Sequence, residues 1–247
     1  MLDAVRRPTT AIGTITPSGN LVVERVTTAV LADFPAVSGH FSRTTVVGSS
    51  DAYADDYDWD GMLRAAELLA HAAPAALVWN GSKGGSLGFE RDRELVERIR
   101  AFTGIAATTS TLAISAAMRA RGERRVALVT PYAAGYAAKI PPHFASAGYD
   151  VVAEAHAGLS DNLSYATVPD EDIVAMARQV ATARPDAIIA YCTNFPAAHL
   201  VGLLETELGI SVYDSTSAGI WGALRLAGVA TAPGARWGSL FGLHLTP

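Results

Sequence analysis

The chain has 247 residues, a formal charge of −5, and 50% hydrophobic but only 17% charged side chains. This length accommodates one large or two small domains, and the charge-poor composition excludes a disordered or fibrous protein. A pI near 5.6 without any basic run argues against nucleic acid as the main partner. The N-terminal residues 1–8 show no signal-peptide core, and no apolar run reaches about 18 residues. We therefore expect a cytoplasmic protein without a membrane partner, and the composition leaves an oligomer open.

Short β-branched runs alternate with longer amphipathic runs, the pattern of βα units on a parallel sheet. The predicted strands cover residues 11–16, 41–47, 75–79, 105–108, 126–130, 151–155, 187–191 and 211–214. The predicted helices cover residues 22–34, 60–71, 91–103, 111–120, 133–147, 170–183, 197–208 and 217–226. Asp170 and Ser217 are predicted N-caps of the two helices that they begin.

Strand-end motifs recur in the same order in both halves of the chain. Thr-Pro closes the first predicted strand at Pro17 and the fifth at Pro131. Gly-Ile, followed by Ser-Thr, occurs at Gly104 and again at Gly209. The third and seventh strands are matched as residues 76–80 with residues 188–192.

This repeat predicts an α/β fold built from two pseudo-symmetric halves, each with a four-stranded parallel sheet. The first half is predicted to comprise residues 1–115, completed by residues 215–247, and the second to comprise residues 116–214. Ligands of open parallel sheets bind beyond the carboxyl ends of the strands. We therefore expect the active site in the cleft between the halves, where the loops after strands one, three, five and seven converge.

Cys192, the single cysteine, follows the seventh predicted strand. A lone cysteine forms no intrachain disulfide and is commonly a small buried hydrophobe. Here the amides of Thr193 and Asn194 follow it and can donate to an anion. A predicted helix begins just beyond, and its N-terminus is expected to lower the pKa of the thiol. Position thus favours a reactive thiol.

The loop after the third strand, residues 80–88, is rich in glycine and hydroxyl groups and can present amides to carboxylate oxygens. It matches no nucleotide-binding fingerprint, so no cofactor is predicted. It contains G-x-S-x-G around Ser86, but Ser86 lies far beyond the strand end without an evident histidine partner, which argues against a serine hydrolase. The six histidines lack metal-binding spacing, so no metal is predicted. Tyr132 is equally compatible with core packing and with contact to an anion.

At these residues the sequence resembles the aspartate/glutamate racemase superfamily, in the branch of arylmalonate decarboxylase and maleate cis-trans isomerase. The resemblance extends over nearly the whole chain. The segments most similar to the decarboxylase are residues 103–111, 124–132, 217–228 and 233–241. Residues 17–20 and 161–162 are more similar to the isomerase.

Racemases of this superfamily use two cysteines, one from each half, whereas here Gly81 stands at the first-half position. The resemblance therefore implies a cofactor-independent decarboxylase in which Cys192 protonates an enediolate. It also implies a set of oxyanion- and carboxylate-binding residues, namely Gly81, Ser82, Lys83, Tyr132, Thr193 and Asn194. The pocket would be lined by Pro17, Ser18, Asn20 and Asn162. A cysteine at position 81 is expected to introduce racemase-like behaviour.

The sequence departs from the decarboxylase at Thr193-Asn194, which replaces two glycines, and at Lys83, which replaces a small hydroxyl residue. Asn20 and Asn162 suggest a small, polar dicarboxylate as substrate. Three functions stay open: a decarboxylase of 2-substituted malonates, an isomerase or racemase that uses Ser82 or Lys83 opposite the thiol, and a catalytically silent binding protein for small acids.

Overall fold

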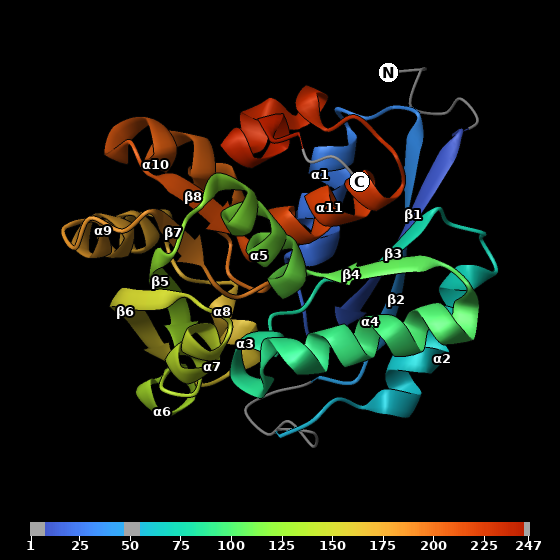
Figure 1. Ribbon diagram of the computed structural model, residues 1–247, viewed down its shortest axis with the longest axis horizontal. Helices are drawn as coiled ribbons and strands as arrows, with labels where there is room; N and C mark the ends of the chain where they lie inside the picture. Colours follow the sequence, from blue (N-terminus) through green and yellow to red (C-terminus); the bar gives the residue numbers. More distant parts are fainter. Residues whose placement is uncertain (1–7, 47–54, 245–247) are drawn as a thin grey trace.

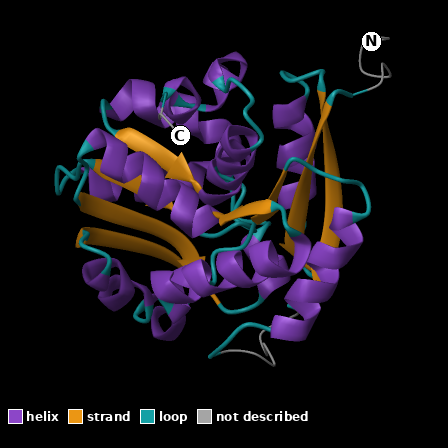
Figure 2. Cartoon of the chain, turned by 45° about the vertical axis from the view of Figure 1, so that its right-hand side comes forward, coloured by secondary structure: helices purple, strands orange, loops and turns teal. Residues whose placement is uncertain are grey.

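Two four-stranded parallel sheets occupy opposite sides of the molecule in the computed structural model, which describes residues 8–46 and 55–244 (Figures 1 and 2). The first sheet has the order β2-β1-β3-β4 and the second the order β6-β5-β7-β8. All neighbouring strands run parallel, which confirms the predicted fold class. The strands are β1 (Thr10–Pro17), β2 (Val37–Thr44), β3 (Ala76–Trp79), β4 (Ala106–Thr109), β5 (Arg125–Tyr132), β6 (Asp150–Leu159), β7 (Ala187–Ala190) and β8 (Ser211–Asp214).

The first sheet is covered on both faces, so that its central strands β1 and β3 are largely buried. Helices α2 (Trp59–Ala70) and α4 (Phe89–Thr103) pack on one face, where Leu77 and Trp79 of β3 join a small core cluster. Val78, between them, belongs to the main core on the opposite face, which α11 (Ser215–Leu226) covers. Helix α1 (Val23–Leu31) packs beside α11. Successive residues of β3 thus alternate between the two core clusters on opposite faces of the sheet.

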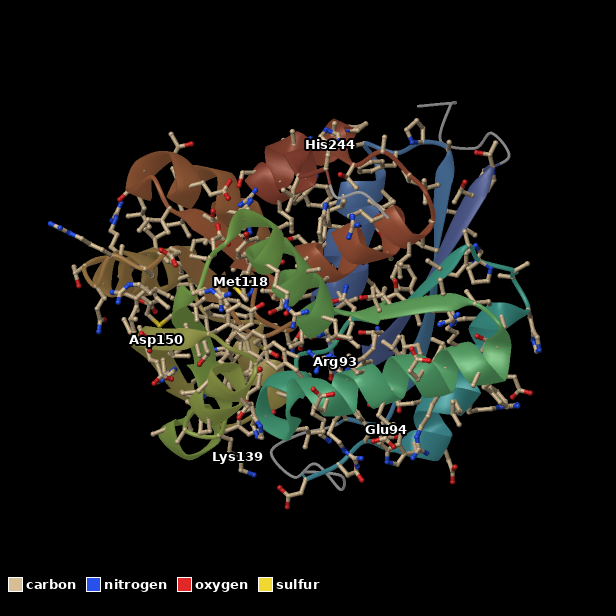
Figure 3. The ribbon with its side chains drawn as sticks, viewed as in Figure 1. Arg93, Glu94, Met118, Lys139, Asp150 and His244 are labelled. Atoms are coloured by element: carbon tan, nitrogen blue, oxygen red, sulfur yellow. The ribbon has the colours of Figure 1, made fainter. Side chains whose placement is uncertain are left out.

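The second sheet is covered by α7 (Ile140–Ser146), α9 (Asp170–Ala181) and α10 (Val201–Leu208). Between the two sheets, α5 (Ser110–Arg121) packs against α11 near the centre of the molecule (Figure 1). The contact is close because Gly222 of α11 has no side chain: a Cβ there would lie 2.9 Å from that of Ala113. Met118 of α5, labelled in Figure 3, belongs to the main core, which runs through both halves.

Helix α11 follows the last strand of the second sheet but contacts β3 and β4 of the first. Assignment of residues 1–115 with 215–247 and of 116–214 to separate halves stays a prediction about domains. None of the helices in the described part of the chain is long and apolar enough to cross a membrane.

Several predicted elements differ from the observed ones. The second strand is 37–44 rather than 41–47, and residue 47 lies outside the described residues. The predicted helix 133–147 is split into α6 (Ala134–Ala137) and α7, because Pro141 and Pro142 lack the amide hydrogens that a continuous helix needs. The predicted helix 197–208 begins with a 3₁₀ turn before α10. Short helices α3 (Gly84–Leu87) and α8 (Asn162–Tyr165) were not predicted.

Both predicted N-caps are wrong, Asp170 by one residue and Ser217 by three. Pro169 precedes α9, so Asp170 is its first helical residue. Helix α11 is capped by Asp214, whose carboxylate accepts a hydrogen bond from the Ser217 amide. Ser217 therefore lies in the first turn and donates to the cap.

Candidate active site

A cavity of about 340 Å³ lies where the carboxyl ends of β1, β3, β5 and β7 meet. The loops after these strands converge there, as expected for two facing parallel sheets. Its walls are formed by Pro17, Asn20, Val46, Trp79, Gly81, Ser82, Lys83, Tyr132, Ala133, Gly135, Tyr136, Lys139, Leu159, Ser160, Asn162, Tyr165, Cys192, Thr193 and Asn194. Lys139, between α6 and α7, lies at the outer edge of the molecule (Figure 3).

The hydrogen-bonding register shows which residues of the two halves are equivalent. Trp79 of β3 pairs with Ile15 of β1, and Ala190 of β7 pairs with Val129 of β5. Each is the last residue of its strand, and each pairs with the residue two positions before the Thr-Pro proline of the neighbouring strand. Trp79 and Ala190 are therefore structural counterparts.

The next residues continue this equivalence. The amides of Asn80 and Tyr191 each donate a 2.9 Å hydrogen bond to the carbonyl at the same register position on the neighbouring strand. Gly81 and Cys192 come directly after them, so they occupy equivalent places. The sequence match of residues 76–80 with 188–192 is therefore wrong by one residue, because strand pairing equates Ala76 with Ala187.

Helices that cross between the sheets hold these two loops in place. The hydroxyl of Tyr191 lies 2.7 Å from that of Thr111 at the start of α5. Asn80 donates from Nδ2 to the carbonyl of Thr216 at 3.1 Å, at the start of α11, and accepts from the Ser110 hydroxyl at 2.8 Å. Buried hydrogen bonds thus fix Asn80, which precedes Gly81, and Tyr191, which precedes Cys192.

Cys192 is buried at the cavity wall, with its side chain only 4% exposed. Burial raises the pKa of its thiol to about 11, although hydrogen bonds with Tyr132, the Asn194 amide and Ser82 oppose the rise. The Asn194 amide donates to Sγ at 3.3 Å. The expected lowering of this pKa is wrong, because α10 begins only at Val201 and desolvation outweighs the local donors. At neutral pH the group is a thiol, which can give a proton.

Tyr132 combines the two roles that the sequence left open. Its ring packs edge-on against Tyr136 and Tyr165, with centroid distances of 4.7 and 5.3 Å. Its hydroxyl lies 3.0 Å from that of Ser82. Burial raises the pKa of Tyr132 well above its usual range, so the phenol stays a donor. Two hydroxyls, of Ser82 and Tyr132, and the thiol of Cys192 thus lie together at one wall of the cavity.

Amide side chains form another part of the wall. Nδ2 of Asn162 is buried and has no hydrogen-bond partner among the described residues. Asn194 donates from Nδ2 to the Asn162 carbonyl at 2.5 Å and accepts from the Leu21 amide at 2.8 Å. Asn20 caps α1 through the amides of Val22 and Val23, each at 2.8 Å. Nδ2 of Asn20 donates to the Thr193 hydroxyl at 3.4 Å, so among these three asparagines only Asn162 has an unpartnered side-chain nitrogen.

The structure brings most of the predicted site residues together but places some differently. Ser18 does not line the cavity, because its hydroxyl exchanges hydrogen bonds with the backbone of Val46, at 3.1 and 3.2 Å. The Asn194 amide, predicted to hold an oxyanion, donates to sulfur instead. The roles assigned to the other residues stay predictions.

Sequence reasoning missed Trp79, Tyr136, Lys139 and Tyr165. Trp79 precedes the loop that was singled out. Tyr136 and Tyr165 come from short helices that the sequence did not resolve, and Lys139 lies between two helices where a single one was predicted. Lys83 and Lys139 line the cavity, and no carboxylate does so in residues 8–46 and 55–244. Lys139 also forms an ion pair with the exposed Asp55 at 3.2 Å, but the lining itself carries only positive charge among the described residues, which favours an anionic ligand. The described residues hold no group of three or more histidine, cysteine or acidic side chains arranged for a metal ion.

Comparison with known proteins places this geometry in a family. The family model described as arylmalonate decarboxylase matches residues 49–241. Maleate isomerase of Nocardia farcinica is 28% identical over 236 residues, which cover 91% of this chain and 93% of the isomerase. Arylmalonate decarboxylase of Bordetella bronchiseptica is 29% identical over 164 residues, which cover 64% of this chain and 68% of the decarboxylase.

A solved structure shows the same fold. It is a cysteine-to-serine variant of Nocardia farcinica maleate cis-trans isomerase with a covalently bound succinylcysteine intermediate. It superposes with a TM-score of 0.80 at 26% identity, covering 94% of this chain and 98% of the isomerase chain. The chain therefore belongs to the arylmalonate decarboxylase family of enzymes, which its relatives link to both decarboxylation and isomerisation.

Proposed function

We propose that the protein is a cofactor-independent decarboxylase of 2-substituted malonates or similar small dicarboxylates. The observation that carries the proposal is the pairing of one buried thiol, Cys192, with a glycine at the equivalent place, Gly81. Loss of CO₂ needs a stabilised enediolate and one proton donor, but no nucleophile. A site with one acid and several neutral donors meets these needs.

In the proposed reaction, the bond between the α-carbon and one carboxylate breaks, and CO₂ leaves. The bonding electron pair stays on the remaining fragment as an enediolate. The Cys192 thiol then transfers its proton to the α-carbon, giving the monocarboxylate and a thiolate. Water returns a proton to the thiolate, which restores the resting enzyme.

The cavity supplies support for each stage. The hydroxyls of Ser82 and Tyr132 lie beside the thiol and can donate to the enediolate oxygens. Asn162 and Lys83 in the cavity lining support binding of a carboxylate. Because burial keeps the pKa of Cys192 at about 11, the sulfur carries its proton at neutral pH.

The test is release of CO₂ from a panel of 2-substituted malonates. We expect turnover by the unaltered protein, and a loss of at least about 100-fold in kcat for both Cys192→Ser and Cys192→Ala. Thermal unfolding of the variants serves as a control for correct folding. Full activity of either variant contradicts the role of the thiol.

An isomerase of maleate or a related acid is a second candidate. Asparagines in the cavity and the coverage of the maleate isomerase favour it. Incubation in deuterated water separates the two functions: fumarate from maleate, or exchange at the α-carbon without CO₂, supports isomerisation. Protection of the thiol by a dicarboxylate without turnover of any substrate supports silent binding.

A further inference from the structure

We propose that Trp79 is a specificity-determining residue, because its indole occupies the place that a side chain at position 81 would take. Position 81 can then present no reacting side chain to the ligand opposite Cys192. The chemical consequence rests on the proposed function, whereas the steric assignment stands by itself.

The overlap follows from the position of the indole. A Cβ at Gly81 would lie under 3.0 Å from Cζ2, Cε2 and Cη2 of Trp79. Carbon atoms in ordinary contact are about 3.5–4.0 Å apart. Gly81 is not in a left-handed conformation, so the backbone itself accepts a side chain. The indole therefore restricts this position to glycine.

The indole has no empty space in which to turn aside. Trp79 is 1% exposed and belongs to the core cluster beneath α2 and α4. Its ring makes an edge contact with Tyr57, at a centroid distance of 6.2 Å and an interplanar angle of 89°. Displacing it would disturb the packing of both helices.

The second half shows the reverse distribution of bulk. Ala190 stands at the place of Trp79, and Cys192 at the place of Gly81. A methyl group at the strand end leaves room for the thiol two residues later. In the first half the larger of the two residues stands at the strand end, and in the second half it stands two residues later.

Trp79 is one of the residues that line the cavity, and its ring fills the space next to Gly81. With indole on the first-half side and sulfur on the other, the enediolate receives its proton from the side of Cys192. This shielding predicts a product of one handedness from a prochiral substrate. It also means that a cysteine placed at position 81 overlaps the indole unless Trp79 is changed as well.

A double-mutant cycle tests the steric assignment without any substrate. Gly81→Ala is expected to lower Tm by roughly 5 °C or more in the unaltered chain. In a Trp79→Ala background the same change should cost little or nothing. Trp79→Phe, which keeps a buried ring, replaces Trp79→Ala if that variant fails to fold. Gly135→Ala is the matched control, because Gly135 lines the same cavity and a Cβ there meets nothing within 4 Å.

An equal loss of Tm from Gly81→Ala in both backgrounds overturns the proposal. The chemical consequence is tested by Gly81→Cys, with and without Trp79→Ala, using deuterium exchange at the α-carbon of a chiral 2-substituted acid. Exchange is expected only in the double variant. Exchange in Gly81→Cys alone contradicts the shielding. If the unaltered protein releases no CO₂ from any malonate while the Tm values are coupled, the proposed function fails and the steric assignment stands.

Discussion

Cys192 owes its chemical character to its surroundings rather than to its neighbours in sequence. Burial removes water from the sulfur and disfavours the thiolate, whereas the Tyr132 hydroxyl and the Asn194 amide favour it. Burial is the stronger effect, so the group serves better as an acid than as a nucleophile. A proton donor that waits in its protonated form suits a step in which a carbanion is quenched.

Tyr132→Phe tests this balance at the level of one hydroxyl. Loss of the phenol removes a hydrogen bond that lowers the thiol pKa, so alkylation of Cys192 should begin at higher pH. Loss of a donor to the enediolate should also reduce kcat by about 100- to 1000-fold. Tyr165→Phe, which alters another tyrosine of the same cavity, is the control. It should change the pH profile of alkylation and kcat less than Tyr132→Phe does. An unchanged pH profile of alkylation contradicts the contact.

At the scale of elements, one buried carboxylate ties the start of α4 to its neighbours. Asp92 accepts hydrogen bonds from the hydroxyls of Tyr57, before α2, and Thr109, at the end of β4. A Cβ on Gly84 would collide with this carboxylate, so the loop that carries Ser82 lies directly against it. Burial raises the pKa of Asp92 to about 6. The site loop therefore rests on a group that takes up a proton on folding at mildly acidic pH.

This linkage has a definite sign. Between the unfolded pKa of 3.8 and the folded pKa of about 6, the folded state binds more protons than the unfolded state. Asp92 therefore makes the free energy of unfolding fall as pH rises through this range, by up to about 1.4 kcal/mol per pH unit. Urea titrations from pH 4 to pH 7 should show this slope reduced in Asp92→Asn.

Asp186→Asn provides a control of opposite sign. The backbone amides of Arg124 and Arg125 lower the pKa of Asp186, so its contribution to stability is lost as pH falls. The variant should lose stability at neutral pH and approach the unaltered protein in acid. A slope that is unchanged in Asp92→Asn contradicts the protonation of that carboxylate.

At the scale of the whole molecule, the main core passes from one sheet to the other without interruption. Residues of β1 and β3 share it with residues of β5, β7 and β8, and the pair α5 and α11 lies at its centre. Neither sheet can therefore lose its packing without exposing apolar surface of the other. We expect the chain to unfold in a single cooperative transition.

Gly222→Val tests this cooperativity. The new side chain overlaps Ala113 and Thr108, so it should separate α5 from α11 and destabilise the protein by about 1–3 kcal/mol. Tryptophan fluorescence and far-UV circular dichroism should shift together to lower urea. Gly202→Val, at a surface helix where a Cβ meets only a backbone oxygen at 3.5 Å, is the milder control. Two separated transitions contradict a shared core.

Much of this architecture could be predicted because local patterns determine it. The apolar strands 187–190 and 211–214 and the helix over 170–181 follow from composition and periodicity. The split helix near Pro141 was missed although the prolines signal it. Cys192 and Gly81 could be singled out by their place after strand ends and by resemblance.

Other features depend on contacts that the sequence does not reveal. The direction of the Cys192 pKa shift depends on how many groups surround the sulfur. The conflict between Trp79 and position 81 depends on the rotamer of a core residue two positions earlier. The binding of the Ser18 hydroxyl by the Val46 backbone depends on the register of β1 with β2.

Because α11 follows the second sheet but packs on the first, it restricts movement of the two sheets relative to each other. In a clamshell protein the two lobes are joined by a linker that bends, whereas here α11 packs on the first sheet after leaving the second, and α5 packs against α11 between the sheets. Their starts also grip the residues that precede Gly81 and Cys192. We therefore expect a ligand to reach the cavity without a hinge motion of one sheet against the other.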